Sequence, residues 1–597
     1  MRMWRRLGSP QAAPRVVFGE PQRKNRLHGV LNLSVDAEVP SVILDRGKLC
    51  ILAVTMSYKK QRNSQKLRRK MLTLETPPMG WNSYNHYNCY PSEEIMKTNA
   101  QGLVDLGLAD LGYKYVTTDC GWMSRDRDSE GRLQWNTTLF PSGGKALGDY
   151  IHNLGLKFGL YSGAGYYQCG STDLPASLAA GFEEIDAASF AEWAGDSLKY
   201  DNCYSSSRDK MADYVSPIST SPDRHKKMAA ILDGVDRDIA YFICQWGLGE
   251  DLGEWAPPIG NVYRISNDVY NSWRSVWRIT NQVVPFYRST SVGAYPDMDM
   301  LIVGLKALSL EEEKFHFGMW AINKSPLNIG APTDPKLTPA ASFDVLRNEE
   351  VIAINQDSLG EQARLIRRYT EEEWDIWAGE LSGSRVVLGI ANWKNDSQTV
   401  EFDLSAVNVS EAQARDVWAA KDIGRISGVQ KLELAGHEMR LLVLSDIVKP
   451  TSSPTSKGYY SVENATLSGN AKKVSCEEAE CAPAGSKISI AVQGAKATFG
   501  SVVASSEGKK LVGVDFINYE LALDSAWDWG SNTRNMTIAV NGGDPKRWAF
   551  PISGGDWFES DRLLIEVDGF VAGENQVVFA TSGNVPAPDL VGFEVFE

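Results

Sequence analysis

The sequence predicts a multidomain protein, α/β followed by all-β, in which a TIM (β/α)8 barrel precedes an antiparallel β-sandwich and a separate β jelly-roll module. Between residues 73 and 335, short apolar runs alternate with longer helical stretches, the pattern of parallel βα units. In 336–447, and again in 459–597, short alternating strands are separated by polar turns. A chain of 597 residues is long enough for three such domains.

The barrel prediction depends on counting strands. Helical stretches such as 92–112 and 145–155 separate most of the candidates. The strand candidates are residues 78–83, 113–119, 157–162, 197–201, 240–245, 262–266, 294–299 and 316–322. Eight repeats in about 250 residues match a TIM barrel in count and in length. A doubly wound sheet is the alternative, but it needs no eighth strand.

The composition changes at both ends of these domains. Residues 1–72 hold 16 Lys or Arg against 4 Asp or Glu and show no periodic apolar face, so we expect a disordered extension. Residues 448–458 contain KPTSSPTSKG, whose Pro, Ser, Thr and Gly content predicts a flexible tether. On such a tether the last module, 459–597, would act independently of the barrel.

Charge and hydropathy exclude some partners. The net charge of −14 argues against a general affinity for nucleic acid, which needs cationic side chains to neutralise phosphates. The apolar run of residues 49–56 is too short to span a bilayer, so we expect no membrane insertion. This run follows Arg46 and Lys48 and loosely resembles a signal h-region, but it lies too far from Met1 for a clear signal peptide.

Cysteine and asparagine patterns favour an extracellular protein. Cys89, Cys120, Cys169 and Cys203 have no CxxC spacing, so disulfides are a better interpretation than a zinc site. Cys476 and Cys481 could close a small loop of their own. Sequons for N-glycosylation occur at Asn136, Asn395, Asn408, Asn464 and Asn535. Disulfides and glycans together are typical of the secretory pathway.

Ionisable residues stand where barrel strands end, which is where TIM-barrel active sites form. A period of two places Lys199 and Asp201 on one inward face, and it does the same for Arg264 and Asp268. Asp119 ends another strand. Paired carboxylates flanked by cations suit acetal hydrolysis, whereas the cations would repel a divalent metal, so we expect neither metal nor cofactor. Ion pairs buried inside the barrel are the structural alternative.

Seven segments carry a resemblance to a known family. They are TPPMGWNSYNHYNCYPSE, YVTTDCGW, KFGLYSGAG, LKYDNCY, ICQWG, YRISNDV and PDMDML. In this order they are similar to the signature segments of glycoside hydrolase family 27, which comprises α-galactosidases and relatives. The resemblance covers residues 76–444, the barrel and the sandwich.

The resemblance implies a retaining exo-glycosidase that removes terminal α-D-galactosyl residues from oligo- or polysaccharides. It implies that Asp201 is the nucleophile and Asp268 the general acid/base. It also implies two disulfides, Cys89–Cys120 and Cys169–Cys203.

The binding residues of the family carry over one at a time. Asp119 matches the aspartate at the axial 4-hydroxyl, Lys199 the lysine at the 3- and 4-hydroxyls, and Arg264 the arginine near the 2-hydroxyl. Cys244 and Trp246 match the segment that reads position 2, in a form that resembles members accepting a free hydroxyl. Taken alone, Cys244 would be an inert core thiol and Trp246 a core side chain.

Two positions depart from the family pattern. Tyr84 stands where Trp is usual as an apolar floor under the sugar. Thr118 stands where galactose-specific members commonly carry an Asp that holds the 6-hydroxyl. Because β-L-arabinopyranose is galactose without that hydroxymethyl group, Thr118 makes a β-L-arabinopyranosidase the nearest alternative. A non-catalytic carbohydrate-binding protein is the alternative from another class, and the presence of both Asp201 and Asp268 argues against it.

The module at 459–597 resembles family 35 carbohydrate-binding modules through YYSVENATLSGNA and PAPDLVGFEV. Members often hold structural calcium, and Glu463 fits that pattern, but Val591 stands where an acidic residue is expected. Trp527, Trp529 and Trp557 could form a sugar platform or could equally be core.

Overall fold

The computed structural model describes residues 74–597 except 172, 178–180, 208, 210–218, 248–249 and 521–531. The expected extension at 1–72, and with it the signal-like run, therefore lies outside the described residues, as do Trp527 and Trp529. Among the described residues, no helix combines the length and apolar character that crossing a bilayer requires.

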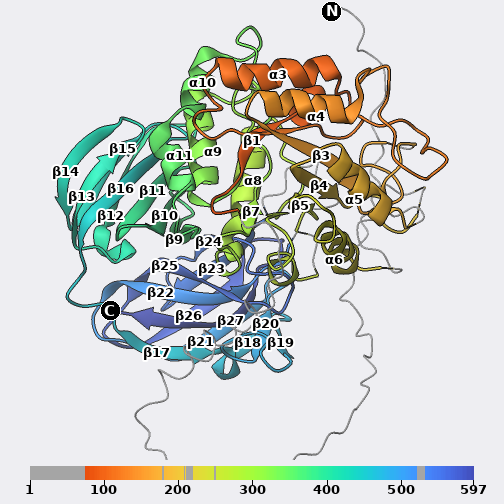
Figure 1. Cartoon of the computed structure of the whole chain (residues 1–597). Coiled ribbons are helices and arrows are strands. Elements are labelled where there is room, and N and C mark those ends of the chain that lie inside the picture. The colour runs from red at the N-terminus through yellow and green to blue at the C-terminus, as the bar shows by residue number, and fades with distance from the viewer. Residues whose placement is uncertain are drawn as a thin grey trace, which may run out of the picture. The chain divides into compact units, whose positions relative to one another are not determined.

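The first described domain is a closed barrel of parallel strands, as the sequence predicts (Figure 1). β1 pairs with both β2 and β8, and Leu301, just after β7, bridges to Ile329 of β8 and closes the sheet. The strands are β1 (Met79–Asn82), β2 (Tyr115–Thr117), β3 (Lys157–Gly163), β4 (Ser197–Asp201), β5 (Ala240–Cys244), β6 (Val262–Arg264), β7 (Tyr295–Asp297) and β8 (Leu327–Ile329).

Helices cover the outside of the barrel, and side-chain caps define where several begin. Ser92, Thr220, Ser272 and Ser309 each accept a hydrogen bond from a backbone N–H in the first turn of their helix. The longer helices are α3 (Glu93–Asp105), α4 (Gly143–Asn153), α5 (Glu183–Glu192), α6 (Ser221–Leu232), α8 (Trp273–Val283) and α9 (Leu310–Ile322). Short elements α2 (Tyr84–Tyr87), α7 (Leu252–Trp255) and η3 (Val284–Arg288) lie between them.

The predicted eighth strand, 316–322, is wrong. These residues form the second half of α9, and the eighth strand is Leu327–Ile329. Every side chain from Phe315 to Ile322 is buried, so the segment has no polar face whose period would show it to be a helix. The signal that does mark a helix is the capping box that Ser309 forms with Glu312.

The second domain is an antiparallel sandwich whose strands begin at Arg364, after the short helices α10 (Ala340–Leu346) and α11 (Glu349–Asn355). A six-stranded sheet faces the pair β12 and β15 across a separate apolar core. The strands are β9 (Arg364–Tyr369), β10 (Trp374–Leu381), β11 (Arg385–Asn392), β12 (Gln398–Asp403), β13 (Glu411–Asp416), β14 (Lys421–Ser427), β15 (Val429–Leu434) and β16 (Met439–Val448).

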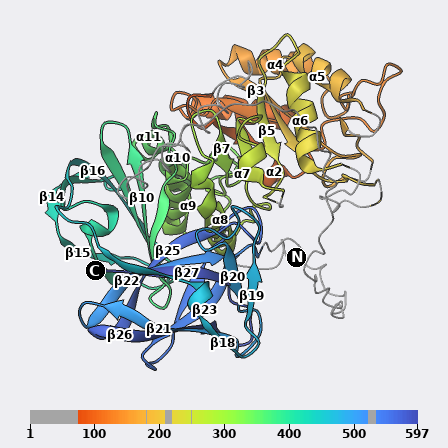
Figure 2. The same cartoon turned by 90° about the horizontal axis from the view of Figure 1, so that it is seen from below.

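The third domain consists of two antiparallel sheets around a core of its own, visible with the rest of the chain in Figure 2. One sheet contains β17 (Ser456–Ser461), β19 (Lys472–Ser475), β20 (Ser486–Ser489), β22 (Gly508–Ile517), β25 (Asp561–Phe570) and β27 (Asp589–Phe596). The other contains β18 (Thr466–Ser468), β21 (Lys496–Ala504), β23 (Arg534–Val540), β24 (Lys546–Phe550) and β26 (Gly573–Thr581).

Two side chains singled out in this module already have protein partners. The Glu463 carboxylate accepts hydrogen bonds from Lys473 at 2.5 Å and from Ser486 at 2.6 Å, so it is paired with a cation of its own domain. Trp557 is half-buried, and the Arg534 guanidinium lies 4.4 Å from the centroid of its ring. One face of the Trp557 ring is therefore in contact with Arg534 of the same domain.

The third domain contacts both of the others, which differs from the expected free tether. The backbone N–H of Ile552 donates to the Asn281 carbonyl of α8 at 3.2 Å. Arg288 of η3 pairs with Glu559 at 2.9 Å and with Asp561 at 2.8 Å. The module is therefore docked on the barrel.

A buried ion pair stands where the three domains meet. Arg368 of β9 binds both carboxylate oxygens of Asp375, at 2.9 and 2.8 Å, and neither side chain is more than 2% exposed. The same guanidinium donates to the Asn281 side chain of the barrel at 2.7 Å and to the Ala549 carbonyl of the third domain at 3.3 Å. One cation thus contacts all three domains.

Arg368→Ala should strongly destabilise the protein, by about 3–5 kcal/mol, because it leaves the buried Asp375 carboxylate without its cation. Arg547→Ala is the matched control: it removes an exposed contact between the third domain and Glu371 of the sandwich, and it should cost no more than about 1 kcal/mol. The temperatures of half-inactivation report both effects, and equal temperatures for the two variants would contradict the role given to Arg368.

Candidate active site

The sequence-predicted site residues meet at the carboxyl ends of the barrel strands. Lys199 and Asp201 lie on β4, whereas Cys244 and Arg264 end β5 and β6. Asp119 follows β2 by two residues. Because parallel strands of a closed barrel all end on one rim, side chains far apart in sequence come into contact there.

Asp119 and Lys199 form a buried ion pair across this rim. The Lys199 ammonium donates to Asp119 Oδ2 at 2.8 Å, and Asn82 Nδ2 donates to the same oxygen at 2.9 Å. Burial would lower the pKa of Lys199, but the neighbouring carboxylates outweigh it and hold that pKa well above its usual value. Lys199 is therefore a permanent cation, which fits a role in binding hydroxyl oxygens.

The Asp201 carboxylate is buried and is held by two donors. Tyr161 Oη donates to Oδ2 at 2.8 Å, and the backbone N–H of Asn202 donates to Oδ1 at 2.9 Å. Burial raises the pKa of Asp201, the Lys199 charge opposes that rise, and the Asp268 charge adds to it. An oriented carboxylate in a low-dielectric site is suited to nucleophilic attack.

Arg264 is shared by two carboxylates. Its Nη2 lies 2.6 Å from Asp268 Oδ1 and 2.6 Å from Asp299 Oδ2. Asp299 also accepts a hydrogen bond from the Val269 N–H at 2.7 Å, so it holds the turn that carries Asp268. Burial raises the pKa of Asp299 to about 6, against the lowering effect of Arg264. Asp268 is the more accessible carboxylate, with 29% of its side chain exposed compared with 4% for Asp299.

Cys244 and Trp246 belong to the polar site and not to the main core of the barrel. Trp246 Nε1 donates to Cys244 Sγ at 3.1 Å, and Arg264 Nη1 approaches the same sulfur at 3.6 Å. Burial raises the pKa of this thiol well above its usual value, so it is neutral. Both side chains pack in a small cluster with Tyr204 and the Cys169–Cys203 disulfide.

Tyr84 and Thr118 lie next to these groups. The Lys199 ammonium is 5.7 Å from the centroid of the Tyr84 ring, and burial, followed by the charges of Asp268 and Asp119, raises the pKa of Tyr84. Thr118 is fully buried, and among the described residues its hydroxyl has no hydrogen-bond partner. Arg264 Nε is likewise buried and unpartnered within the described part of the chain. Such groups suit a ligand rich in hydroxyls.

Two disulfides anchor the loops that follow the strands. Cys89–Cys120 joins the segment after β1 to the residue next to Asp119, and Cys169–Cys203 joins the loop after β3 to the segment after Asp201. Both match the pairing that the family resemblance implies, and Cys476–Cys481 closes the small loop expected in the module.

Gly121, directly after Cys120, lies where the two disulfide-linked loops approach each other. Its φ is +92°, and a Cβ there would lie 2.1 Å from the Cys89 carbonyl oxygen. Its N–H donates to Gln168 Oε1 at 3.1 Å. Only glycine fits this close approach of the two disulfide-linked loops.

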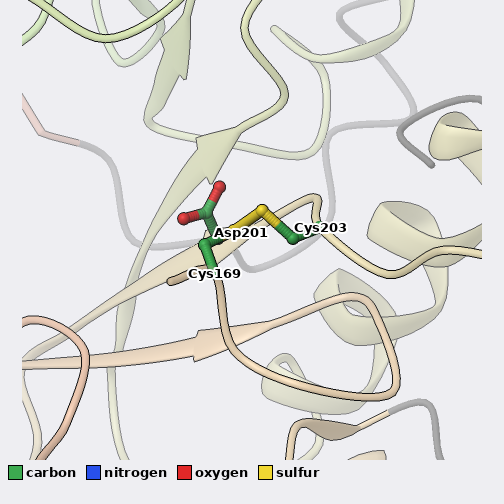
Figure 3. Close-up of side chains that lie close together, drawn as sticks. All are labelled: Cys169, Asp201 and Cys203. Atoms are coloured by element: carbon green, nitrogen blue, oxygen red, sulfur yellow. A yellow bond between two sulfur atoms is a disulfide. The ribbon is translucent and has the colours of Figure 1, made fainter. Parts of the chain in front are cut away.

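Asp201 and the sulfurs of Cys169 and Cys203 lie within 4.8 Å of one another, the spacing of a metal-ligand set (Figure 3). Both sulfurs are bonded to each other, so neither is available as a thiolate ligand. The Cys169–Cys203 disulfide therefore lies next to the Asp201 carboxylate.

Comparisons with known proteins agree with this geometry. A family model described as α-galactosidase A matches residues 76–357, and a model of the α-galactosidase C-terminal β-sandwich domain matches residues 371–444. The probable α-galactosidase D of Aspergillus fumigatus is 38% identical, with 87% of this chain and 96% of that protein covered. The chain belongs to the α-galactosidase family. As a member, it is a glycoside hydrolase that releases α-galactosyl groups.

Solved structures give the same fold. The α-galactosidase I of Mortierella vinacea is 33% identical with a TM-score of 0.59, covering 64% of this chain and all of that one. A β-L-arabinopyranosidase of Geobacillus stearothermophilus has a TM-score of 0.56 but is only 23% identical, covering 66% of this chain and 99% of that one, so it shows the fold alone. The α-galactosidase prediction is confirmed, and the arabinopyranosidase alternative rests on Thr118 only.

Sequence reasoning assigned no role to Tyr161, Asn82 or Asp299. Tyr161 could have been found, because it is in register with Lys199 on the neighbouring strand and so faces the same rim. Asp299 is the last residue of the expected strand 294–299, but its backbone has a left-handed φ of +75°, which no sequence pattern indicates.

Lys199→Gln should shift the pH dependence of hydrolysis. The Lys199 charge keeps the raised pKa of Asp201 from rising further, so its loss should raise that pKa again. Asp201 must be ionised to attack, and the acidic limb of the kcat/KM profile should therefore move to higher pH. Lys145→Gln, on the exposed face of α4, is the control. An unchanged acidic limb in Lys199→Gln would argue against electrostatic support of Asp201.

Proposed function

We propose that this α-galactosidase removes terminal α-D-galactosyl residues from galactose-containing oligo- or polysaccharides with retention of configuration. The single observation that carries the proposal is the pair of differently held carboxylates: Asp201 is buried against Tyr161 and Lys199, and Asp268 is more exposed and tied to Arg264. Retaining enzymes need one carboxylate as nucleophile and another that exchanges a proton with the leaving group.

In the first step Asp201 Oδ attacks the anomeric carbon while Asp268 gives its proton to the glycosidic oxygen, and the bond between that carbon and oxygen breaks. In the second step Asp268 takes a proton from water, the water oxygen attacks the same carbon, and Asp201 leaves as a carboxylate. Tyr161 stabilises the Asp201 anion before attack and after release.

Recognition of galactose follows from the polar residues around these carboxylates. We assign Asp119 and Lys199 to the 3- and 4-hydroxyls, Arg264, Cys244 and Trp246 to position 2, and the Tyr84 ring to the floor of the site. The ion pair of Asp119 with Lys199 supports this assignment, since it presents an acceptor and a donor at one place. Thr118, with its unpartnered buried hydroxyl, is assigned to carbon 6.

We infer that the enzyme acts outside the cell. Three disulfides support this inference, because such bonds persist in oxidising compartments. Exposed sequon asparagines at Asn395, Asn408 and Asn464 are also accessible for glycosylation.

Asp201→Asn should abolish formation of the glycosyl-enzyme, and Asp268→Asn should slow turnover least on nitrophenyl galactosides, whose leaving group needs no proton. Mass spectrometry of enzyme mixed with an activated fluorosugar measures the first effect, and rates on nitrophenyl and alkyl galactosides measure the second. A first product of inverted configuration by NMR would contradict the mechanism.

Thr118→Asp should raise the kcat/KM ratio of nitrophenyl α-D-galactopyranoside to nitrophenyl β-L-arabinopyranoside, by about tenfold if a restored charged hydrogen bond contributes roughly 1.4 kcal/mol. Thr117→Ser is the neighbouring control, because Thr117 is still part of β2, whereas Thr118 follows the strand. A lower ratio, or equal loss on both substrates through repulsion from Asp119, would show that position 118 does not set selectivity.

A further inference from the structure

The loop after β5 has an unusual backbone. φ is +73° at Trp246, +71° at Gly247, +58° at Glu250 and +52° at Asp251. A bulky residue such as Trp rarely adopts a left-handed φ, and such a conformation persists only when its surroundings impose it. The contacts that hold this loop therefore influence where the Trp246 indole lies.

The barrel supplies the first of these contacts. Gly247 is wedged so closely that a Cβ would lie 2.2 Å from the Ile265 carbonyl oxygen and 2.9 Å from Gln282 Nε2. Gln282, in the last turn of α8, is buried. The Gln282 side-chain amide thus packs against the loop at Gly247.

The third domain supplies the next contact. Asn532, itself buried, donates from Nδ2 to Gln282 Oε1 at 2.9 Å. At the other end of the loop, Gly555 faces Asp251 so closely that a Cβ would lie 3.0 Å from Asp251 Oδ1. The module therefore lies against Gln282 at one end of this loop and against Asp251 at the other.

We propose that the third domain helps to shape the galactose site without touching the sugar. Asn532 is a positioning residue that orients Gln282. Gln282 in turn positions the loop that places Trp246 beside Cys244. This rests on the proposed function, in which Cys244 and Trp246 read position 2 of the sugar. It also gives the C-terminal module a role in the hydrolysis of small substrates, which a freely tethered module would not have.

The relatives agree with such a role. The barrel and sandwich end at Val448, yet the Aspergillus fumigatus protein aligns with 87% of this chain, so the similarity must extend well into the third domain. A structural part of the catalytic unit would be kept together with the barrel.

Loss of the Asn532 amide should affect binding more than chemistry. Trp246 touches no reacting bond in the proposed mechanism, so its displacement would weaken the ground state and the transition state alike. KM should therefore rise while kcat stays nearly constant. The rise should be about three- to tenfold, the effect of losing one neutral hydrogen bond.

The test compares full-length Asn532→Ala with Arg547→Ala, which removes an ion pair with Glu371 of the sandwich and a hydrogen bond to Asn535 within the module. On nitrophenyl α-galactopyranoside, Asn532→Ala should raise KM with kcat within about twofold of wild type, and Arg547→Ala should leave both constants unchanged. Gly555→Ala, which crowds Asp251 at the other end of the loop, should also raise KM. This variant tests the proposal if Asn532→Ala does not fold.

Three outcomes would overturn the proposal: an unchanged KM in the folded loop variants, a fall in kcat at constant KM, or an equal KM rise in Arg547→Ala. Calorimetric affinity for galactose separates this proposal from the proposed function. A wild-type enzyme that binds galactose but cleaves no α-galactoside would refute the function, and weaker galactose binding by Asn532→Ala would still support the positioning role.

Discussion

Charge buried at the rim of the barrel is the constraint on which the site depends. A buried ion is costly unless it is paired, and here two of the pairs, Lys199 with Asp119 and Arg264 with Asp299, join different strands. Lys199 on β4 is balanced by Asp119 after β2, and Arg264 on β6 by Asp268 and by Asp299 after β7. The charges therefore hold the strand ends in the relative positions that sugar binding needs. The same ion pairs stabilise the rim and supply the polar side chains of the site.

The loops that follow the strands lie outside the hydrogen-bonded sheet, so other contacts must hold them in place. Disulfides fix the loops next to Asp119 and Asp201. The loop after β5 has no disulfide; Gln282 and the third domain support it instead. Disulfides and the docked third domain thus each fix a loop at the rim of the barrel. Substitutions far from the sugar should therefore change sugar binding when they loosen one of these loops.

Much of this arrangement could be predicted because its signals are local. Six of the barrel strands lie within the ranges expected from their apolar runs, and a seventh, β3, extends one residue beyond its range. The site residues Lys199, Asp201 and Arg264 could be found from strand-end position alone. The eighth strand was missed because α9 is buried on all sides and loses its helical period. Asp299 was not assigned a role because its contact with Arg264 depends on an irregular backbone and not on a repeat.

The sequence by itself determined the order of the domains, the chemical groups at the strand ends and the family to which the chain belongs. These follow from periodicity and from motifs that are contiguous in the chain. Only the tertiary structure decided how Arg264 is divided between two carboxylates, that Tyr161 serves Asp201, and that the third domain rests on the barrel. Apart from the pair of Arg264 with Asp268, which are four residues apart, these are contacts between residues distant in sequence. Their geometry depends on how the barrel closes and the domains pack, which no local pattern encodes.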